Sequence, residues 1–207
     1  MKLSHRLWEA NQDLATACLK HPFVQGIYDG TLPKEKFAGY VGQDAFFLEA
    51  FARAYSIAAA KAPDWSGFVT FHTLAQGVLT ELELHGQYAS SWGIDLATVR
   101  PGRATRQYTD FLLSVAWSQT VGVTAAAMFP CMRLYEYIGQ SLAQNGVPQH
   151  AYSDWINTYS NDEFEPLATQ LELLVNQHSP DTPLVTETFR YAMQCEYDFF
   201  DAAWQGK

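Results

Sequence analysis

The sequence predicts an all-α protein that folds as a single-domain helical bundle. Apolar side chains recur every three or four residues over most of the chain, which is the spacing that gathers them on one face of a helix. No stretch alternates apolar and polar residues long enough to indicate a strand. No Gly/Ser-rich or like-charge segment resembles a linker, so we expect one domain over residues 1–207.

Proline and glycine set the limits of the first helix and of the connector after it. An apolar stripe predicts a helix that ends near His21, because the proline that follows disfavours helical backbone in the residue before it. Residues 21–33 are expected to form a connector, with Gly30 as a helix stop. Thr31 is the expected N-cap of the next helix.

Two long helices are predicted after the connector. The first runs to about Ala62 and carries many aromatic residues at helical spacing on one side. The second is expected over residues 64–92, between Pro63 and the glycine stop Gly93.

The second half of the chain begins after a loop at residues 94–103. Its helices are predicted at residues 104–119, 122–144, 149–159, 162–178 and 184–204. Pro130 lies inside one of them and predicts a kink, because proline cannot donate the backbone hydrogen bond that a helix interior requires.

Charge and hydropathy exclude several classes of function. Lys and Arg number 13 against 22 Asp and Glu, a formal net charge of −9 without a basic stripe, so we expect no nucleic-acid partner. The longest apolar run, residues 121–132, is shorter than the roughly 20 residues of a membrane span, so we expect no membrane partner. A secretory signal needs a continuous apolar core, but the first residues of the chain include His5, Arg6 and Glu9. We therefore expect a cytoplasmic protein.

The three cysteines are Cys18, Cys131 and Cys195. Their odd number and the lack of CxxC spacing argue against a disulfide framework and against a structural zinc site. Cys131 directly follows Pro130, and kinks often mark functional sites. A reactive cysteine needs a lowered pKa or a nearby base, yet the local sequence offers only Arg133, which faces elsewhere. A buried, inert thiol therefore remains an alternative for each cysteine.

Two carboxylates interrupt apolar stripes. Asp44 lies among aromatic residues of the long helix, and Glu196 is similarly surrounded in the last helix. A buried carboxylate is costly unless it is hydrogen-bonded or used, so the two could form a general acid/base pair or a ligand clamp. The alternative is that backbone groups or tyrosine hydroxyls simply satisfy them.

Glu81 and His85 lie one helical turn apart and raise the question of a di-metal site. Such sites in helical bundles use Glu-x-x-His on two helices together with further carboxylates, and the sequence has no second copy. We therefore interpret the two residues as a helix-stabilising or core pair and expect no metal.

Tyrosines are spread over several predicted helices and could converge on one cavity. They are Tyr108, Tyr135, Tyr137, Tyr159 and Tyr197. Ring faces suit flat ligands, although aromatic stripes at helical spacing are more often part of a core.

Several segments together resemble the TenA family, thiaminase type II, over essentially the whole chain. They are HPFVQGIYDGTLP at 21–33, QDAFF at 43–47, FPCMRLY at 129–135, WINTYSNDEF at 155–164 and CEYDFF at 195–200. The resemblance implies the haem-oxygenase-like helical fold without haem or another cofactor, and a homotetramer. It also implies a small-molecule substrate, a 4-amino-2-methylpyrimidine with a substituted 5-methylene group. Hydrolysis would replace the substituent by hydroxyl in thiamin salvage, and thiamin itself would be cleaved more slowly.

The resemblance also assigns roles to residues. Cys131 matches the nucleophile of the family's cysteine-containing branch, and Glu196 matches its acid/base residue. The implied substrate-binding residues are Asp44 at the amino edge of the ring, Phe47 and Tyr159 at its faces, and the hydrogen-bonding Tyr108 and Tyr135.

Two other functions remain open at this point. One is an oxidase or oxygenase of the same fold that uses bound metal or oxygen, and near-stoichiometric iron in purified protein would support it. The other is a non-catalytic, pyrimidine-binding regulatory protein, which would bind a pyrimidine without forming product.

Overall fold

The structure is a computed structural model. It describes the backbone of residues 1–207 and every side chain except those of Leu84, Gln87, Tyr88 and Ser91. Over this backbone it is all-α, without a strand. The α-helices are α1 (Leu3–Glu9), α2 (Gln12–Leu19), α3 (Pro22–Asp29), α4 (Lys34–Lys61), α5 (Trp65–Ser91), α6 (Arg103–Ser118), α7 (Val121–Ala143), α8 (Ser153–Ser160), α9 (Glu165–His178) and α10 (Pro183–Gln205), with a 3₁₀ turn, η1, at Leu96–Thr98.

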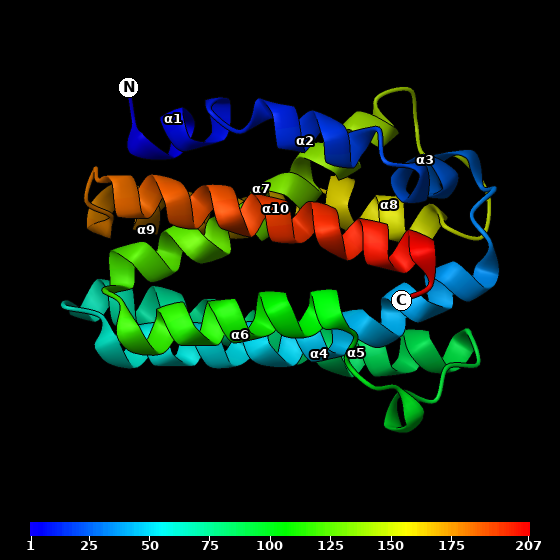
Figure 1. The fold of residues 1–207 in the computed structure, drawn as a ribbon, viewed down its shortest axis with the longest axis horizontal. Coiled ribbons are helices and arrows are strands. Elements are labelled where there is room, and N and C mark those ends of the chain that lie inside the picture. The colour runs from blue at the N-terminus through cyan, green and yellow to red at the C-terminus, as the bar shows by residue number, and fades with distance from the viewer.

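The long helices lie roughly along one axis (Figure 1). Helix α4 packs against α5 and α6 on one side of the bundle, and α7 packs against α8, α9 and α10 on the other. The short helices α2 and α3 pack on the outside of α10, and α1 packs against α9. The interior thus lies between a layer built on α4 and a layer built on α7.

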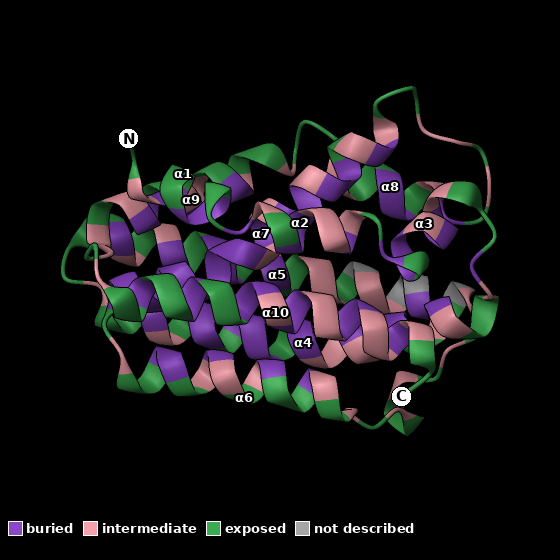
Figure 2. Ribbon diagram, turned by 45° about the horizontal axis from the view of Figure 1, so that its top comes forward, coloured by how far each residue is buried: buried purple, intermediate pink, exposed green. Residues whose placement is uncertain are grey.

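Aromatic side chains fill much of the interior. The largest fully buried ones are Phe23, Phe37, Phe51, Phe71, Phe129, Phe189, Phe200, Tyr40, Tyr55, Tyr108 and Tyr152. Figure 2 shows the buried faces of α4, α7 and α10 turned toward one another. Burial of such rings is the main source of stability in this fold. Most of the aromatic content therefore belongs to the core, as its helical spacing indicated.

The prediction of one first helix is wrong, because the chain divides into α1 and α2. The division follows from Asn11, whose buried side-chain amide donates to the carbonyl of Leu7 at 2.8 Å. Such a side-chain bond to the backbone competes with the helical hydrogen-bond ladder.

The connector predicted at residues 21–33 contains a helix, α3. Pro22 occupies its first turn, where a proline loses no hydrogen bond, and the His21 ring accepts from the Phe23 amide at 3.2 Å as a cap. The glycine stop is confirmed, since Gly30 has φ 72° in the left-handed region. The prediction that Thr31 caps α4 is wrong: Pro33 is in that position, and Thr31 closes α3 through its bond to Gly26.

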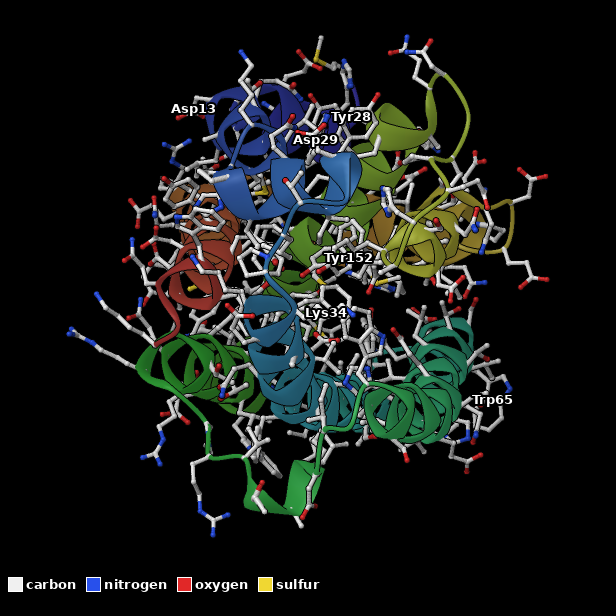
Figure 3. All side chains as sticks on the ribbon, turned by 90° about the vertical axis from the view of Figure 1, so that its right-hand side faces the viewer. Asp13, Tyr28, Asp29, Lys34, Trp65 and Tyr152 are labelled. Carbon is white, nitrogen blue, oxygen red and sulfur yellow. The ribbon has the colours of Figure 1, made fainter. Side chains whose placement is uncertain are left out.

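The remaining helices confirm their predicted positions within a few residues, apart from the start of α8. Residues 149–152 lie outside it, and Tyr152 is turned inward, where its hydroxyl donates to the Leu32 carbonyl. Figure 3 shows this inward position and, in contrast, Trp65 projecting from the edge of the bundle. Pro130 lies within the continuous helix α7, so it does not end the helix. In the part of the chain that the structure describes, no helix has the length and apolarity needed to span a membrane.

Candidate active site

A cavity of about 350 Å³ lies between the two layers. Its walls come from α4, α5, α7, α8 and the start of α9. The lining residues are Asp44, Phe47, Leu48, Phe51, Tyr55, Leu74, Gly77, Val78, Thr80, Glu81, Cys131, Met132, Tyr135, Thr158, Tyr159, Asn161, Glu163, Phe164 and Leu167. The wall is mostly apolar, with a few polar groups directed inward, which is typical of a small-molecule site.

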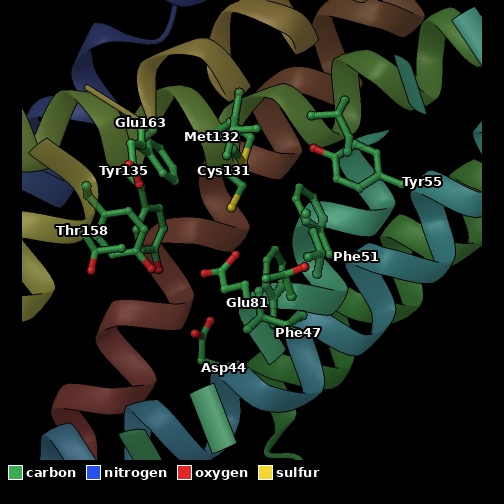
Figure 4. A pocket seen from close by; sticks show the side chains of 18 of the residues that line it. Asp44, Phe47, Phe51, Tyr55, Glu81, Cys131, Met132, Tyr135, Thr158 and Glu163 are labelled. Atoms are coloured by element: carbon green, nitrogen blue, oxygen red, sulfur yellow. The ribbon is translucent and has the colours of Figure 1, made fainter. Parts of the chain in front are cut away.

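Cys131 presents its sulfur to this cavity (Figure 4). It directly follows Pro130 in α7, and its thiol is hydrogen-bonded to the carboxyl group of Glu196. Burial raises the pKa of the Cys131 thiol well above its ordinary value, and the charge of Glu196 adds to the rise. The resting form is therefore the thiol, which needs a base before it can act as a nucleophile. Arg133 does not activate the thiol, because its guanidinium group pairs with Glu136 at 2.7 Å. This agrees with the prediction that Arg133 faces away from Cys131.

Glu196 lies behind Cys131 rather than in the cavity wall. It projects from α10, is 2% exposed, and accepts a hydrogen bond of 2.6 Å from the Tyr108 hydroxyl. Burial raises the pKa of the Glu196 carboxyl to about 8, although the bonds from Tyr108 and Cys131 oppose the rise. A carboxyl group with this pKa exchanges a proton readily near neutral pH, and its position gives it direct access to the thiol.

Asp44 faces the cavity from α4. Burial raises the pKa of its carboxyl group to about 7. The basic side chain beside it is His85, whose Nδ1 lies 3.8 Å from Oδ2 of Asp44. The other ring nitrogen, Nε2, lies 2.8 Å from the carbonyl of Val41, and since a carbonyl only accepts, Nε2 carries a proton. The Asp44 oxygens thus stay available to a bound molecule.

Glu81 also lines the cavity, although the sequence did not identify it as a site residue. Burial raises the pKa of Glu81 to about 7; the charge of Asp44 adds to this rise and His85 opposes it. Glu81 accepts no hydrogen bond from any side chain that the structure describes, whereas the His85 ring faces Asp44 and Val41. The spacing of Glu81 and His85 was the available signal. Among the described side chains, no group of three or more His, Cys, Asp or Glu is placed to hold a metal ion.

Aromatic rings form opposite parts of the wall. Phe47, on α4, stacks on Phe51 with ring centroids 5.1 Å apart and an interplanar angle of 28°. Tyr159, on α8, meets Tyr135 edge-on at 4.7 Å. The Tyr135 hydroxyl is hydrogen-bonded to that of Tyr40 at 3.1 Å. These contacts hold the rings in fixed orientations around the cavity.

Gly139 allows Tyr159 to take this position. A Cβ atom added at Gly139 would lie 2.4 Å from the carbonyl oxygen of Tyr159, a distance that no side chain tolerates. The absence of a side chain at this position of α7 therefore lets α8 approach closely and bring Tyr159 to the cavity.

The structure brings most of the predicted site residues together. Five of them line the cavity, namely Asp44, Phe47, Cys131, Tyr135 and Tyr159. Tyr108 and Glu196 form a hydrogen-bonded pair behind Cys131. Tyr137 and Tyr197 lie elsewhere and pack against Trp8 and His21. Cys18 and Cys195 are buried thiols away from the cavity wall.

Tyr55 is a further cavity residue, and the sequence did not predict it. Its ring lines the cavity and is 1% exposed, and its hydroxyl has no hydrogen-bond partner among the described residues. A buried hydroxyl without a protein partner is available to a bound molecule. The helical pattern offered no signal for this, because Tyr55 falls on the same apolar stripe as core residues of α4.

Residues 8–206 match the family model described as TENA/THI-4/PQQC. The chain belongs to this family. As a TENA/THI-4/PQQC member, it is 32% identical over 217 residues to the aminopyrimidine aminohydrolase of Halalkalibacterium halodurans, covering 99% of this chain and 96% of that protein. It is 36% identical to the thiamine biosynthesis multifunctional protein ThiED of Corynebacterium efficiens, of whose length it spans 28%.

Solved structures confirm the fold of this family member. A TenA homologue from P. horikoshii superposes with a TM-score of 0.92 at 24% identity, with 100% of both chains covered. Heme oxygenase-1 from Synechocystis, in complex with heme, superposes with a TM-score of 0.63 at 15% identity, with 100% of this chain and 94% of that one covered. The prediction of a haem-oxygenase-like helical bundle is thereby confirmed.

Proposed function

We propose that the protein is an aminopyrimidine aminohydrolase of thiamin salvage that acts in the cytoplasm. Its substrates are 4-amino-2-methylpyrimidines with a substituted 5-methylene group, either the aminomethyl compound or thiamin. One observation carries this proposal: the Cys131 sulfur faces a cavity that also contains the carboxyl group of Asp44. The thiol of Cys131 is hydrogen-bonded to the carboxyl group of Glu196 behind it. The name of the full-length relative from H. halodurans supports the proposal.

The cavity suits a flat, amino-substituted ring. Phe47 and Tyr159 offer ring faces from α4 and α8, between which a pyrimidine stacks. Asp44 accepts hydrogen bonds from the 4-amino group and the adjacent ring edge. The Tyr135 hydroxyl provides a further polar contact.

Cys131 and Glu196 carry the chemistry. Glu196 takes the proton of the thiol, and the thiolate adds to ring carbon 6, next to the carbon that bears the methylene group. The addition places negative charge on a ring nitrogen, which is neutralised by a proton from Glu196. The remaining double bond between carbons 4 and 5 is an enamine of the 4-amino group, and its electron pair then expels the substituent and leaves an exocyclic methylene group. Water adds to this methylene, and departure of the thiol restores the aromatic ring, so that R–CH₂–X and water give R–CH₂–OH and HX.

The test compares the wild type with Cys131→Ala. Each protein is incubated with the aminomethylpyrimidine and, separately, with thiamin, and the products are separated by chromatography. Wild type is expected to form the hydroxymethylpyrimidine, and Cys131→Ala to lose at least about 10³-fold of this activity while it stays folded. Absence of product from a folded wild type would overturn the proposed reaction. Equal turnover by the variant would overturn the role of Cys131.

We also propose that the protein forms a homotetramer. Large apolar side chains lie exposed at one end of the bundle, where Trp65 is 76% and Trp117 is 71% exposed. Both lie near the same place in the fold, because Lys61, the last residue of α4 and four residues before Trp65, donates to the Trp117 carbonyl at the end of α6. Exposed aromatic surface of this kind is typical of an interface between subunits. Light scattering coupled to gel filtration measures the assembly directly.

A further inference from the structure

We propose that Glu81 binds a positively charged substituent on the 5-methylene group of the substrate and thereby selects substrates with a cationic leaving group. This inference rests on the function proposed above and concerns the same cavity. It assigns a specificity role to a residue of α5 that neither the thiol chemistry nor the binding of the ring uses.

The order of groups around the ring determines which residue faces the substituent. The 4-amino group, which Asp44 binds, is on carbon 4, and Cys131 adds to carbon 6. The methylene group is on carbon 5, between these two. Figure 4 shows the carboxyl group of Glu81 between the Cys131 sulfur and the carboxyl group of Asp44. A pyrimidine held by Asp44 and attacked by Cys131 therefore turns its substituent toward Glu81.

Glu81 is free to take a cation. It has no hydrogen bond or ion pair with a described side chain, although its carboxyl group is directed into a largely apolar cavity. A carboxylate in such a place is destabilised until a donor or a positive charge reaches it. Burial raises the pKa of Glu81 to about 7, which fits a group that ionises when a cation binds beside it.

The surroundings of Glu81 favour positive charge. A second cavity of about 290 Å³ adjoins the first and shares Asp44, Glu81, Thr158 and Tyr159 with it. Its further acidic residue is Asp154, and Trp155 adds an indole ring. None of the described residues that line either cavity is a lysine or arginine, and the basic side chain in the wall of the second cavity, His85, lies with Nδ1 3.8 Å from Oδ2 of Asp44. The adjoining space accommodates a substituent larger than an amino group, and its carboxylates and ring attract a cation.

Both proposed substrates carry such a charge. The aminomethyl group is an ammonium at neutral pH, and the substituent of thiamin is a thiazolium ring. An uncharged substituent of similar size, such as a methoxymethyl group, lacks this interaction. Glu81 would thus bind two substituents of different shape because both carry a positive charge.

The test measures binding in a protein that cannot turn the ligand over. Dissociation constants are determined by calorimetry for 5-aminomethyl- and 5-methoxymethyl-4-amino-2-methylpyrimidine, in Cys131→Ala and in Cys131→Ala with Glu81→Gln. Loss of Glu81 is expected to weaken binding of the ammonium compound by about ten-fold or more, and binding of the methoxymethyl compound by less than about three-fold. Glu83→Gln is the matched control, because Glu83 is exposed on the same helix and is expected to change neither constant.

The outcomes separate this inference from the proposed function. Equal weakening of both compounds, or weakening of neither, would overturn the role of Glu81 while leaving the hydrolase intact. Failure of both compounds to bind, together with absence of product from wild type, would overturn the proposed function and the inference with it. Because glutamine matches glutamate in size, thermal unfolding of the Glu81→Gln protein checks that the fold is retained.

Discussion

The outer face of the helical bundle and the cavity treat carboxylates in opposite ways. On the outer face, Asp13 accepts two hydrogen bonds from Arg190, at 2.6 and 2.7 Å, and the bond to Arg190 lowers the pKa of Asp13 to about 2. In the cavity, burial raises the pKa of Asp44 to about 7, and the ring of His85 lies 3.8 Å away, beyond hydrogen-bond distance. One carboxylate is satisfied by the protein, and the other is left for a ligand.

The difference shows that the cavity contains carboxylates whose burial lowers the stability of the folded protein. Burial raises the pKa of Asp44, Glu81 and Glu196, and the charge of Asp44 adds to the rise at Glu81 and at Glu196. No arginine or lysine lines the cavity among the described residues. Unpaired buried charges destabilise a protein, so such an arrangement is typical of a functional site rather than of a core. The predictions below test whether the cavity carboxylates act in this way.

The largest effect is expected for Glu196→Gln, which removes the proton acceptor next to Cys131. We expect kcat to fall by about 10²- to 10³-fold, because that is the usual contribution of a positioned acid/base group. Turnover of the aminomethylpyrimidine measures the loss. Glu187→Gln is the control, since Glu187 is exposed near the start of the same helix. A glutamine variant that keeps full activity would show that Glu196 is only a buried, satisfied carboxyl group.

The second prediction concerns the packing that forms the cavity wall. In Gly139→Ala, the alanine would stabilise the helix by about 1 kcal/mol relative to glycine. However, its Cβ atom would lie 2.4 Å from the carbonyl oxygen of Tyr159, so the two atoms overlap. Overlap with backbone outweighs propensity, so we expect a net loss of about 1–3 kcal/mol in the free energy of unfolding, together with weaker pyrimidine binding. Urea unfolding and calorimetry measure the two effects.

Gly39→Ala is the matched control for Gly139→Ala. Gly39 is an exposed residue of α4, and a Cβ atom there would meet nothing within 4 Å. Helix propensity alone then applies, and the protein is expected to become more stable by about 1 kcal/mol. Similar effects of the two substitutions would contradict the close approach of α7 and α8.

The fold and much of the candidate site were predictable from the sequence. Apolar periodicity is a local signal, and it placed the long helices α4 to α7 and α10 within a few residues. Asp44 and Glu196 were recognisable because a charged residue within an aromatic stripe stands out. The role proposed for Cys131 needed the family resemblance, since its proposed base, Glu196, lies 65 residues further along the chain and reaches it only in the folded protein.

Other features depend on packing and gave no local signal. Tyr55 has the spacing of a core residue, and only the folded structure shows its hydroxyl unpartnered at the cavity. The division between α1 and α2 arises from a side-chain hydrogen bond of Asn11. Helix α3 arises because Pro22, which ends the preceding helix, also begins the next one. Apolar periodicity indicates which face of a helix is buried, but not which residues of other helices pack against that face.

The third prediction uses the pH dependence of stability. The Glu196 carboxyl has a pKa of about 8 in the folded protein, against 4.5 for an ordinary glutamate. Between these values the folded state binds more protons than the unfolded state, so stability falls as the pH rises. From pH 6.5 to 8.5 Glu196 should contribute a loss of about 2 kcal/mol in the free energy of unfolding. Urea unfolding should therefore show a smaller decrease for Glu196→Gln than for wild type, and equal decreases would contradict the raised pKa.

The smallest effect is expected on the outer face, for Asp13→Asn. Because the folded pKa of Asp13 is lowered to about 2, any stability it contributes is present above its ordinary pKa and is lost only as the pH falls toward 2. Between pH 6.5 and 8.5 the carboxylate stays ionised, so the variant should show the same pH dependence as wild type. The pair is exposed to solvent, and its loss should shift the unfolding midpoint by less than about 3 °C and leave turnover unchanged. A change in the pH dependence comparable to that of Glu196→Gln would mean that charges on the two faces are coupled through α10, which carries both Arg190 and Glu196.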